Sequence, residues 1–146
     1  MKITAVKING MPHPMGYAFS NVTASWRVED AMSARQKEST VRIALDADMC
    51  EVICEKTGRL PSAGVAMDVA LKPRTTYYVQ ISVTGERGDG AVSETTSFDT
   101  GKMEEPWEAK WIGTSLDCDF HPLLATAFAA KRNVRRARLY ITGVGL

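Results

Sequence analysis

The sequence has 146 residues, which suits one domain of ordinary size, or one domain with a fragment of a second. Its 18 Lys and Arg residues nearly balance 17 Asp and Glu residues, and the net charge of +1 argues against a strongly basic nucleic-acid-binding protein. Hydrophobic residues make up 45% of the chain and charged residues 24%, which argues against disorder. No apolar run approaches the roughly 18 residues that span a bilayer, so we expect no membrane partner.

Short alternations of apolar and polar residues predict strands along the first 100 or so residues. Residues 1–8 alternate lysines with apolar residues and lack the continuous apolar stretch of a signal peptide. A polar loop is expected over 29–38, a turn over 56–59 and a glycine-rich hairpin loop over 85–90. The predicted strands are 1–8, 22–28, 41–45, 51–55, 65–71, 75–84 and 91–100.

Six or seven such strands in about 100 residues predict a β-sandwich over residues 1–101. Trp26 alternates with Thr and Ser neighbours in the second run, which places it in the core rather than on a sugar-binding surface. The glycines of the hairpin loop, Gly85, Gly88 and Gly90, do not form a phosphate-binding loop, because a hairpin connection does not lead into a helix N-terminus.

Residues 102–146 are expected to form a linker and the first strands of an incomplete second β-domain. Trp107 and Trp111 follow a polar connector that ends in a proline, and we expect them to pack at a domain junction rather than bind a ligand. The runs 123–128 and 137–142 predict strands. About 45 residues are too few for an independent core, so we expect the second domain to continue beyond the last residue.

The cysteines indicate free thiols rather than disulfides or a metal site. Cys50, Cys54 and Cys118 are an odd number and cannot form a complete disulfide framework. Cys50 and Cys54 could be two zinc ligands, but the two histidines, His13 and His121, have no paired spacing, and structural zinc needs four clustered ligands. We therefore expect no metal, no cofactor and a reducing, cytoplasmic location.

A marked charge asymmetry lies near the C-terminus. Because Arg136 and Arg138 alternate with Ala137 and Leu139, the pattern predicts a strand with one solvated face rather than a nucleic-acid-binding patch. The cluster consists of Lys131, Arg132, Arg135, Arg136 and Arg138.

A pattern specific for fold occupies residues 71–81. The segment L-K-P-R-T-T-Y-Y-V-Q-I resembles the fibronectin type III pattern L-x-P-x-T-x-Y-x-V-x-V, and Phe98-Asp99-Thr100 resembles the F-x-T that ends the last strand of such domains. The resemblance implies that the Tyr77 hydroxyl bonds to the backbone of the preceding corner. The fold class is thus all-β: an immunoglobulin-like, fibronectin type III-like β-sandwich with a short C-terminal β extension.

Further segments resemble the N-terminal region of bacterial α-L-rhamnosidases over essentially the whole chain. Those enzymes open with a strand, an N-P-x-G-type turn, for which this chain has His13-Pro14-Met15-Gly16, and an S-W strand. Residues 107–113 resemble W-x-A-K-W-I-G, and residues 136–145 resemble R-A-R-L-Y-I-T-G-x-G. The matching segments, in chain order, are 8–16, 25–26, 76–83, 98–101, 107–113 and 136–145.

This resemblance implies a non-catalytic accessory part of a glycoside hydrolase. The intact protein would hydrolyse terminal α-L-rhamnosides with inversion, using two carboxylates in an (α/α) barrel downstream of this region. That barrel would be the partner of this chain, and rhamnoside substrate would bind only in the intact enzyme. We therefore assign no catalytic, cofactor-binding or metal-binding residue in the 146 residues.

Two other functions remain open. A free-standing fibronectin type III-like module that binds a protein partner explains residues 71–81, but not the segments 107–113 and 136–145. A carbohydrate-binding module would need exposed aromatic residues or a calcium site, and no loop rich in Asp and Asn is evident. Because the strand at 137–142 lacks a neighbour, we expect it to become ordered through a contact, such as a homodimer of the chain.

Overall fold

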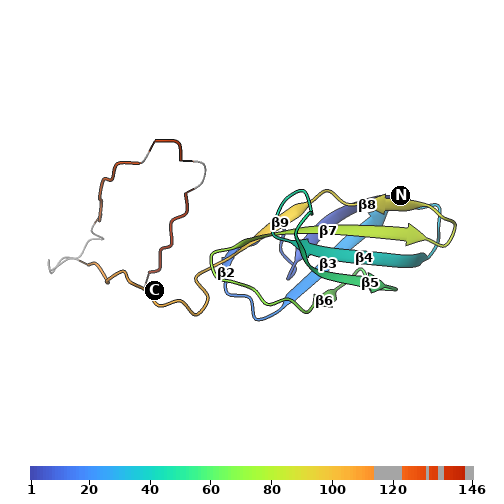
Figure 1. Cartoon of the computed structure of the whole chain (residues 1–146), viewed down its shortest axis with the longest axis horizontal. Coiled ribbons are helices and arrows are strands. Elements are labelled where there is room, and N and C mark those ends of the chain that lie inside the picture. Colours follow the sequence, from blue (N-terminus) through green and yellow to red (C-terminus); the bar gives the residue numbers. More distant parts are fainter. Residues whose placement is uncertain (114–122, 131, 135–136, 144–146) are drawn as a thin grey trace. The chain divides into compact units, whose positions relative to one another are not determined.

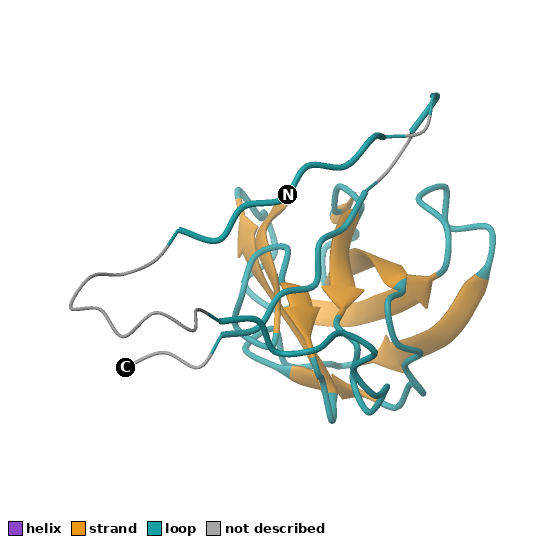
Figure 2. Cartoon of the chain, turned by 90° about the vertical axis from the view of Figure 1, so that its left-hand side faces the viewer, coloured by secondary structure: helices purple, strands orange, loops and turns teal. Residues whose placement is uncertain are grey.

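The computed structural model describes residues 1–113, 123–130, 132–134 and 137–143 (Figure 1). The chain divides into two units, Met1–Trp107 and Glu108–Leu146. All strands of the described residues lie in the first unit, and those residues contain no helix (Figure 2). In this part of the chain, accordingly, no helix is long and apolar enough to cross a membrane.

Nine strands form two sheets that pack face to face, which confirms the predicted all-β, immunoglobulin-like sandwich. The smaller sheet has the order β1-β3-β6, and the larger has the order β2-β9-β7-β4-β5, with β8 also pairing with β7. All the pairings are antiparallel except that of β2 with β9, which is parallel. The strands are β1 (Lys2–Ile8), β2 (Met15–Tyr17), β3 (Val22–Glu29), β4 (Gln36–Ala44), β5 (Val52–Gly58), β6 (Val65–Met67), β7 (Thr76–Gly85), β8 (Gly90–Val92) and β9 (Thr96–Thr100).

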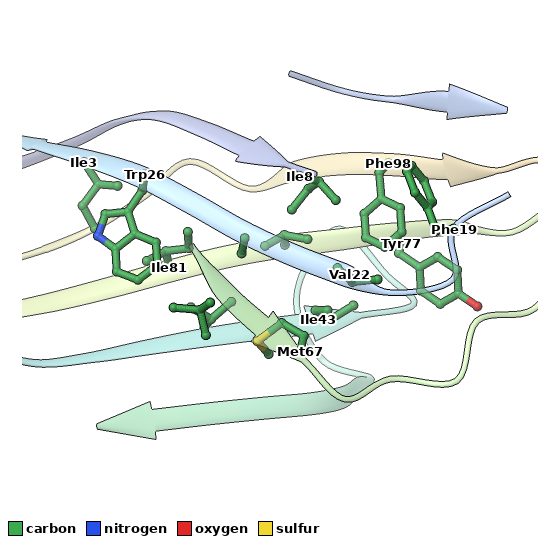
Figure 3. Packing of buried hydrophobic residues seen from close by; sticks show 14 of the residues in the cluster. Ile3, Ile8, Phe19, Val22, Trp26, Ile43, Met67, Tyr77, Ile81 and Phe98 are labelled. Atoms are coloured by element: carbon green, nitrogen blue, oxygen red, sulfur yellow. The ribbon is translucent and has the colours of Figure 1, made fainter. Parts of the chain in front are cut away.

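The core consists of the inward side chains of both sheets (Figure 3). Alternation along β7 buries Tyr77 and leaves Tyr78 half-buried on the opposite face, as the sequence pattern predicts. Trp26 is 5% exposed, so its predicted place in the core is confirmed. Figure 3 shows Ile3 beside Trp26 at one end of the core, and Tyr77 with its aromatic neighbours at the other.

The single return strand predicted over 91–100 is wrong, because two strands share that edge of β7. β8 pairs with the end of β7 and β9 with its beginning. Between them, the Ser93 N–H donates to the Ile81 carbonyl (2.7 Å) and the Ile81 N–H donates to Ser93 Oγ (3.0 Å). The serine hydroxyl thus replaces a backbone acceptor and interrupts the regular ladder without leaving the Ile81 amide unsatisfied.

Three other boundaries differ from the predicted ones. The turn predicted at 56–59 is wrong, because Lys56 and Thr57 continue β5 and pair with β4. Strand β4 begins at Gln36, inside the predicted loop 29–38. Strand β6 ends at Met67, although Val69 and Leu71 still pack against the core. In the first two cases, pairing with another strand extends the ladder through residues whose types favour a turn or a loop.

The edge strand β1 carries a bulge. Its register with β3 shifts between Thr4 and Lys7, and Ala5 adopts the left-handed region at φ 49°. Lys2 and Lys7 on either side of this bulge are exposed. β1 therefore has a distorted and charged outer edge rather than a straight one.

The hairpin loop between β7 and β8 is tied to the loop between β3 and β4. The Asp89 carboxylate accepts hydrogen bonds from the Ser33 hydroxyl, the Ser33 N–H (3.3 Å) and the Met32 N–H (2.9 Å). The Ser33 hydroxyl in turn accepts from the Arg87 N–H (2.9 Å). These bonds, the one from the Ser33 hydroxyl foremost, hold the pKa of Asp89 below its usual value.

The strands predicted at 123–128 and 137–142 are not formed in the residues that the structure describes there. Leu123, Phe128, Leu139 and Ile141 are each at least 80% exposed. A strand with an apolar face needs both a hydrogen-bonded neighbour and a covered face, and these side chains have no such cover. The second β-domain, and its boundary at 101/102, stay predictions.

Candidate functional site

Three of the sequence motifs converge at one end of the sandwich, where β9 ends and the chain leaves the domain. We call this region the exit corner. It consists of residues 13–17, 71–77 and 98–107, and thus combines the N-P-x-G-type turn, the fibronectin-like corner and the F-x-T-G ending. These segments are distant in the sequence, and the parallel pairing of β2 with β9 brings the first against the last.

Tyr77 closes the corner before β7. The Lys72 N–H donates a 2.7 Å hydrogen bond to the Tyr77 hydroxyl, and the Tyr77 ring is buried. The Thr75 hydroxyl donates to the Pro73 carbonyl (2.9 Å). The hydrogen bond implied for the corner tyrosine is therefore present, and it fixes the turn that the proline introduces.

Thr100 joins this corner to the last strand. Its fully buried hydroxyl donates to the Lys72 carbonyl (2.7 Å) and accepts from the Thr75 N–H (2.9 Å). The Thr100 N–H also donates to the Thr75 carbonyl (3.0 Å). Both backbone groups of Lys72 are thus held by side chains of the two motifs, so the threonine of F-x-T and the tyrosine of the corner fix the same residue.

The N-terminal turn locks the end of β9 from the other side. The Asp99 N–H donates to the Pro14 carbonyl, and the Gly101 N–H donates to the Tyr17 carbonyl, both at 2.9 Å. Gly16 has φ +81°, and a Cβ on Gly101 would lie 2.3 Å from the Gly16 carbonyl oxygen. Glycine is therefore required at position 101, because any side chain would force the two backbones apart.

Aromatic rings fill the space beneath the exit corner. The Tyr77 and Phe98 rings stack with centroids 5.2 Å apart, and Phe19 meets Phe98 edge to face at 5.8 Å. Tyr17 lies over Phe19 with a centroid distance of 5.7 Å. These contacts join rings from β2, β7 and β9, and aromatic pairs contribute more than area burial alone. Figure 3 shows Tyr77, Phe98 and Phe19 together at this end of the core.

The connector after β9 remains tied to the corner. The Gly101 carbonyl accepts from the Arg74 N–H (2.8 Å), and the Arg74 guanidinium pairs with Glu105 (2.5 Å). The Lys102 ammonium lies 3.9 Å from the Glu105 carboxylate and 5.1 Å from the centre of the Trp107 ring. These contacts are those of a positioning site, since they fix the path of a chain rather than surround a small ligand.

Trp107 is 48% exposed and Trp111 is 71% exposed, and their packing at a domain junction stays a prediction. The Lys102 ammonium lies over the Trp107 ring, 5.1 Å from its centre, so this ring has a cationic neighbour within its own unit. Met15 and Tyr17 on β2 are also exposed, by 68% and 49%. The surface of the exit corner thus presents apolar side chains to its surroundings.

The cysteine and histidine positions are dispersed in the part of the chain that the structure describes. Cys50 is exposed, and Cys54 on β5 donates its S–H to the Asp68 carbonyl (3.4 Å). Burial, followed by the nearby Asp68 carboxylate, raises the pKa of the Cys54 thiol. Among these residues, no group of three or more His, Cys, Asp or Glu side chains is placed to hold a metal ion. Cys118 and His121 lie outside the described residues.

His13 lies beside a groove of about 610 Å³ along β1 and β8. Its Nδ1 is 3.1 Å from the Thr96 hydroxyl, which also lines the groove. This pairing positions the turn before β2, because β9 begins at Thr96. It therefore has a structural role here.

The basic cluster is only partly visible. Arg132 is exposed and Arg138 is half-buried, whereas Leu139, expected on the covered face, is 83% exposed. Lys131, Arg135 and Arg136 lie outside the described residues. The glycine-rich loop is a turn, as predicted: the Gly88 N–H donates to the Gly85 carbonyl (3.1 Å) and Gly88 has φ +85°.

Sequence reasoning missed β2 and the role of Lys102. A three-residue strand inside His-Pro-Met-Gly-Tyr has no alternation to detect, and its partner β9 is about 80 residues away. The signal available was the turn motif itself, whose glycine needs a positive φ.

Two solved structures resemble this chain. An α-L-rhamnosidase from Streptomyces avermitilis, complexed with L-rhamnose, is 27% identical, with a TM-score of 0.56, and the match covers 77% of this chain and 12% of that protein. An α-L-rhamnosidase from Dictyoglumus thermophilum is 20% identical, with a TM-score of 0.62, over 77% of this chain and 14% of its own, and supports the fold alone. The chain therefore spans a small part of the length of these relatives. No curated protein sequence matches it.

A family match covers most of the sandwich. Residues 3–104 match the family described as Rha78A-like, N-terminal immunoglobulin domain. The match begins in β1 and ends within the connector, so it includes all three segments of the exit corner except the last few connector residues. It agrees with the resemblance to the N-terminal region of rhamnosidases drawn from the sequence motifs. The chain belongs to the family of Rha78A-like N-terminal immunoglobulin domains.

Proposed function

We propose that this chain is a non-catalytic accessory domain of an α-L-rhamnosidase, a glycoside hydrolase that inverts configuration, and that it supports and orients the catalytic part. The observation that carries the proposal is the exit corner. There, two motifs shared with rhamnosidases, the N-P-x-G-type turn and the F-x-T-G ending, hold each other through the Asp99 and Gly101 amides. Such a lock has little use in an isolated sandwich but fixes the direction in which the chain continues.

The partner in this proposal is an (α/α) barrel that follows in the same protein. Met15 and Tyr17 on β2 present apolar surface at the exit corner, which is available for contact with later parts of the protein. The proposal includes the cytoplasmic location, for which the free thiols of Cys50 and Cys54 are the supporting observation. Rhamnoside would be bound by the intact enzyme alone.

The first experiment asks whether the chain has activity of its own. Purified protein is incubated with an aryl α-L-rhamnoside, and we expect no release of the aryl group above the blank. Turnover that disappears when an Asp or Glu of this chain is changed to Asn or Gln would refute the accessory role.

A second experiment separates the two alternatives. Titration of the chain with L-rhamnose, followed by amide chemical shifts, should leave the spectrum unchanged, whereas a carbohydrate-binding module would show saturable shifts.

In the complete protein, Gly101→Ala should lower the unfolding temperature of the catalytic part, because the exit corner would no longer fix the direction of the chain after β9. An unchanged unfolding temperature would refute the supporting role proposed for the exit corner.

A further inference from the structure

We propose that residues 101–107 form a rigid arm of the sandwich, so that the first pivot of the chain lies at the junction of Trp107 and Glu108 rather than at the end of β9. The arm carries no regular secondary structure, and a sequence-based boundary would place it in a flexible linker. Its contacts instead tie it to the exit corner at its beginning, middle and end. The inference concerns this chain alone and does not depend on the proposed function.

The beginning of the arm is held by its backbone on both sides. Gly101 is buried, its N–H donates to the Tyr17 carbonyl (2.9 Å), and its carbonyl accepts from the Arg74 N–H (2.8 Å). Arg74 adopts a left-handed φ of 53°, which directs its amide toward the arm. The first residue after β9 is therefore anchored to two different segments of the domain, and rotation of the arm about it would break both bonds.

The middle of the arm is a turn closed on itself and on the corner. The Glu105 N–H donates to the Lys102 carbonyl (3.0 Å), and Met103 inside this turn has φ 51°. The Glu105 carboxylate then reaches back to the Arg74 guanidinium at 2.5 Å. Arg74 thus holds the arm twice, by its backbone at Gly101 and by its side chain at Glu105.

Lys102 organises the end of the arm. Its side chain is only 9% exposed, an uncommon burial for a lysine. Its ammonium stands between the Glu105 carboxylate at 3.9 Å and the Trp107 ring at 5.1 Å. One cation therefore joins the turn to the last residue of the arm, and the division of the chain after Trp107 coincides with the last of these contacts.

Each charged contact alone would be weak, because the carboxylate and guanidinium are partly exposed and salt screens such pairs. Their effect comes from sharing groups: Arg74 takes part in two interactions of the arm, and Glu105 takes part in three. Loss of Lys102 should therefore loosen the arm from Glu105 onward and leave β9 and the core intact.

Backbone ¹⁵N relaxation on the full chain tests the arm directly. We expect order parameters of about 0.85 from Asp99 through Trp107, the value of rigid backbone, and values below about 0.6 at Ala109 to Gly113. Values below about 0.6 already at Lys102 to Glu105 would overturn the proposal.

Two variants test the assigned contacts. Lys102→Met keeps most of the length of the buried side chain and removes its charge, and Glu105→Gln removes the carboxylate. Each should lower the order parameters of position 105 and Trp107 toward about 0.6 while Thr100 stays near 0.85. Lys110→Met, beyond the arm, is the matched control and should change none of them. If both arm variants leave Glu105 and Trp107 as ordered as in the unchanged chain, these charges do not hold the arm and the proposal is overturned.

Discussion

Tyr77→Phe removes one oxygen atom from the exit corner and leaves the rest of the core in place. The phenylalanine ring can keep the stacking of Tyr77 on Phe98, whose centroids are 5.2 Å apart. What is lost is the acceptor of the 2.7 Å bond from the Lys72 N–H. A partly buried amide without its acceptor costs about 1–3 kcal/mol, so the free energy of unfolding should fall by that amount.

Urea unfolding, followed by the fluorescence of buried Trp26, measures this loss. With a slope of about 2 kcal/mol per molar urea, the midpoint should fall by about 0.5–1.5 M and the slope should not change. Tyr78→Phe is the matched control, because Tyr78 lies half-buried on the outer face of the same strand. Its cost should stay within about 0.5 kcal/mol, as for other surface substitutions.

The comparison of the two variants can refute the reasoning. If Tyr78→Phe were the costlier change, the hydroxyl that stabilises the fold would be on the other face of β7. The register of that strand would then be displaced by one residue, and the corner bond could not have the role given to it here.

Three other perturbations address different parts of the molecule. Gly101→Ala places a Cβ 2.3 Å from the Gly16 carbonyl oxygen and should lower the free energy of unfolding by about 1–3 kcal/mol, measured by thermal or urea unfolding. Gly113→Ala, with open space around the new Cβ, should cost less than about 0.5 kcal/mol, and equal costs for the two variants would contradict the close contact. The folded pKa of Asp89 lies below its unfolded value of about 3.9, so the stabilisation by this carboxylate is complete above that pH and is lost as the pH falls. Asp89→Asn should therefore flatten the acid side of the profile of unfolding free energy measured between pH 6 and 2. An unchanged profile would argue against the role of the Asp89 carboxylate. If exposed Leu139 takes part in a homodimer, the chain should sediment as a dimer at high concentration and Leu139→Asp as a monomer, and a monomeric unchanged chain would refute that contact.

The sandwich was predictable because its long strands carry their own alternation. Along β7 every second residue is buried, and in β3 the same phase places Trp26 inside, so period alone identifies both strands and both faces. The corner bond of Tyr77 was predictable from the spacing of a fold-specific pattern, since it depends on residues five apart in the chain.

The remaining features were set by pairing between strands, which the residue types of one segment alone do not reveal. Lys56 and Thr57 have the residue types of a turn, yet β4 extends β5 through them. The break between β8 and β9 depends on one hydrogen bond, which the Ile81 N–H donates to the Ser93 hydroxyl. At the exit corner, β2 takes its structure from β9, which is why its turn motif could be matched to a family but not to a position in a sheet.

The bulge in β1 affects how this domain behaves beside other β-rich domains. An edge strand with regular hydrogen-bonding groups can recruit a neighbour's strand, which leads to swapped or aggregated chains during synthesis, when concentrations of unfinished segments are high. The left-handed backbone at Ala5 disrupts the regular spacing of hydrogen-bonding groups that an incoming strand would need. Pairing at this edge would also have to bury the charges of Lys2 and Lys7, which is unfavourable. A sandwich protected in this way can fold beside other β-rich segments without capturing their strands.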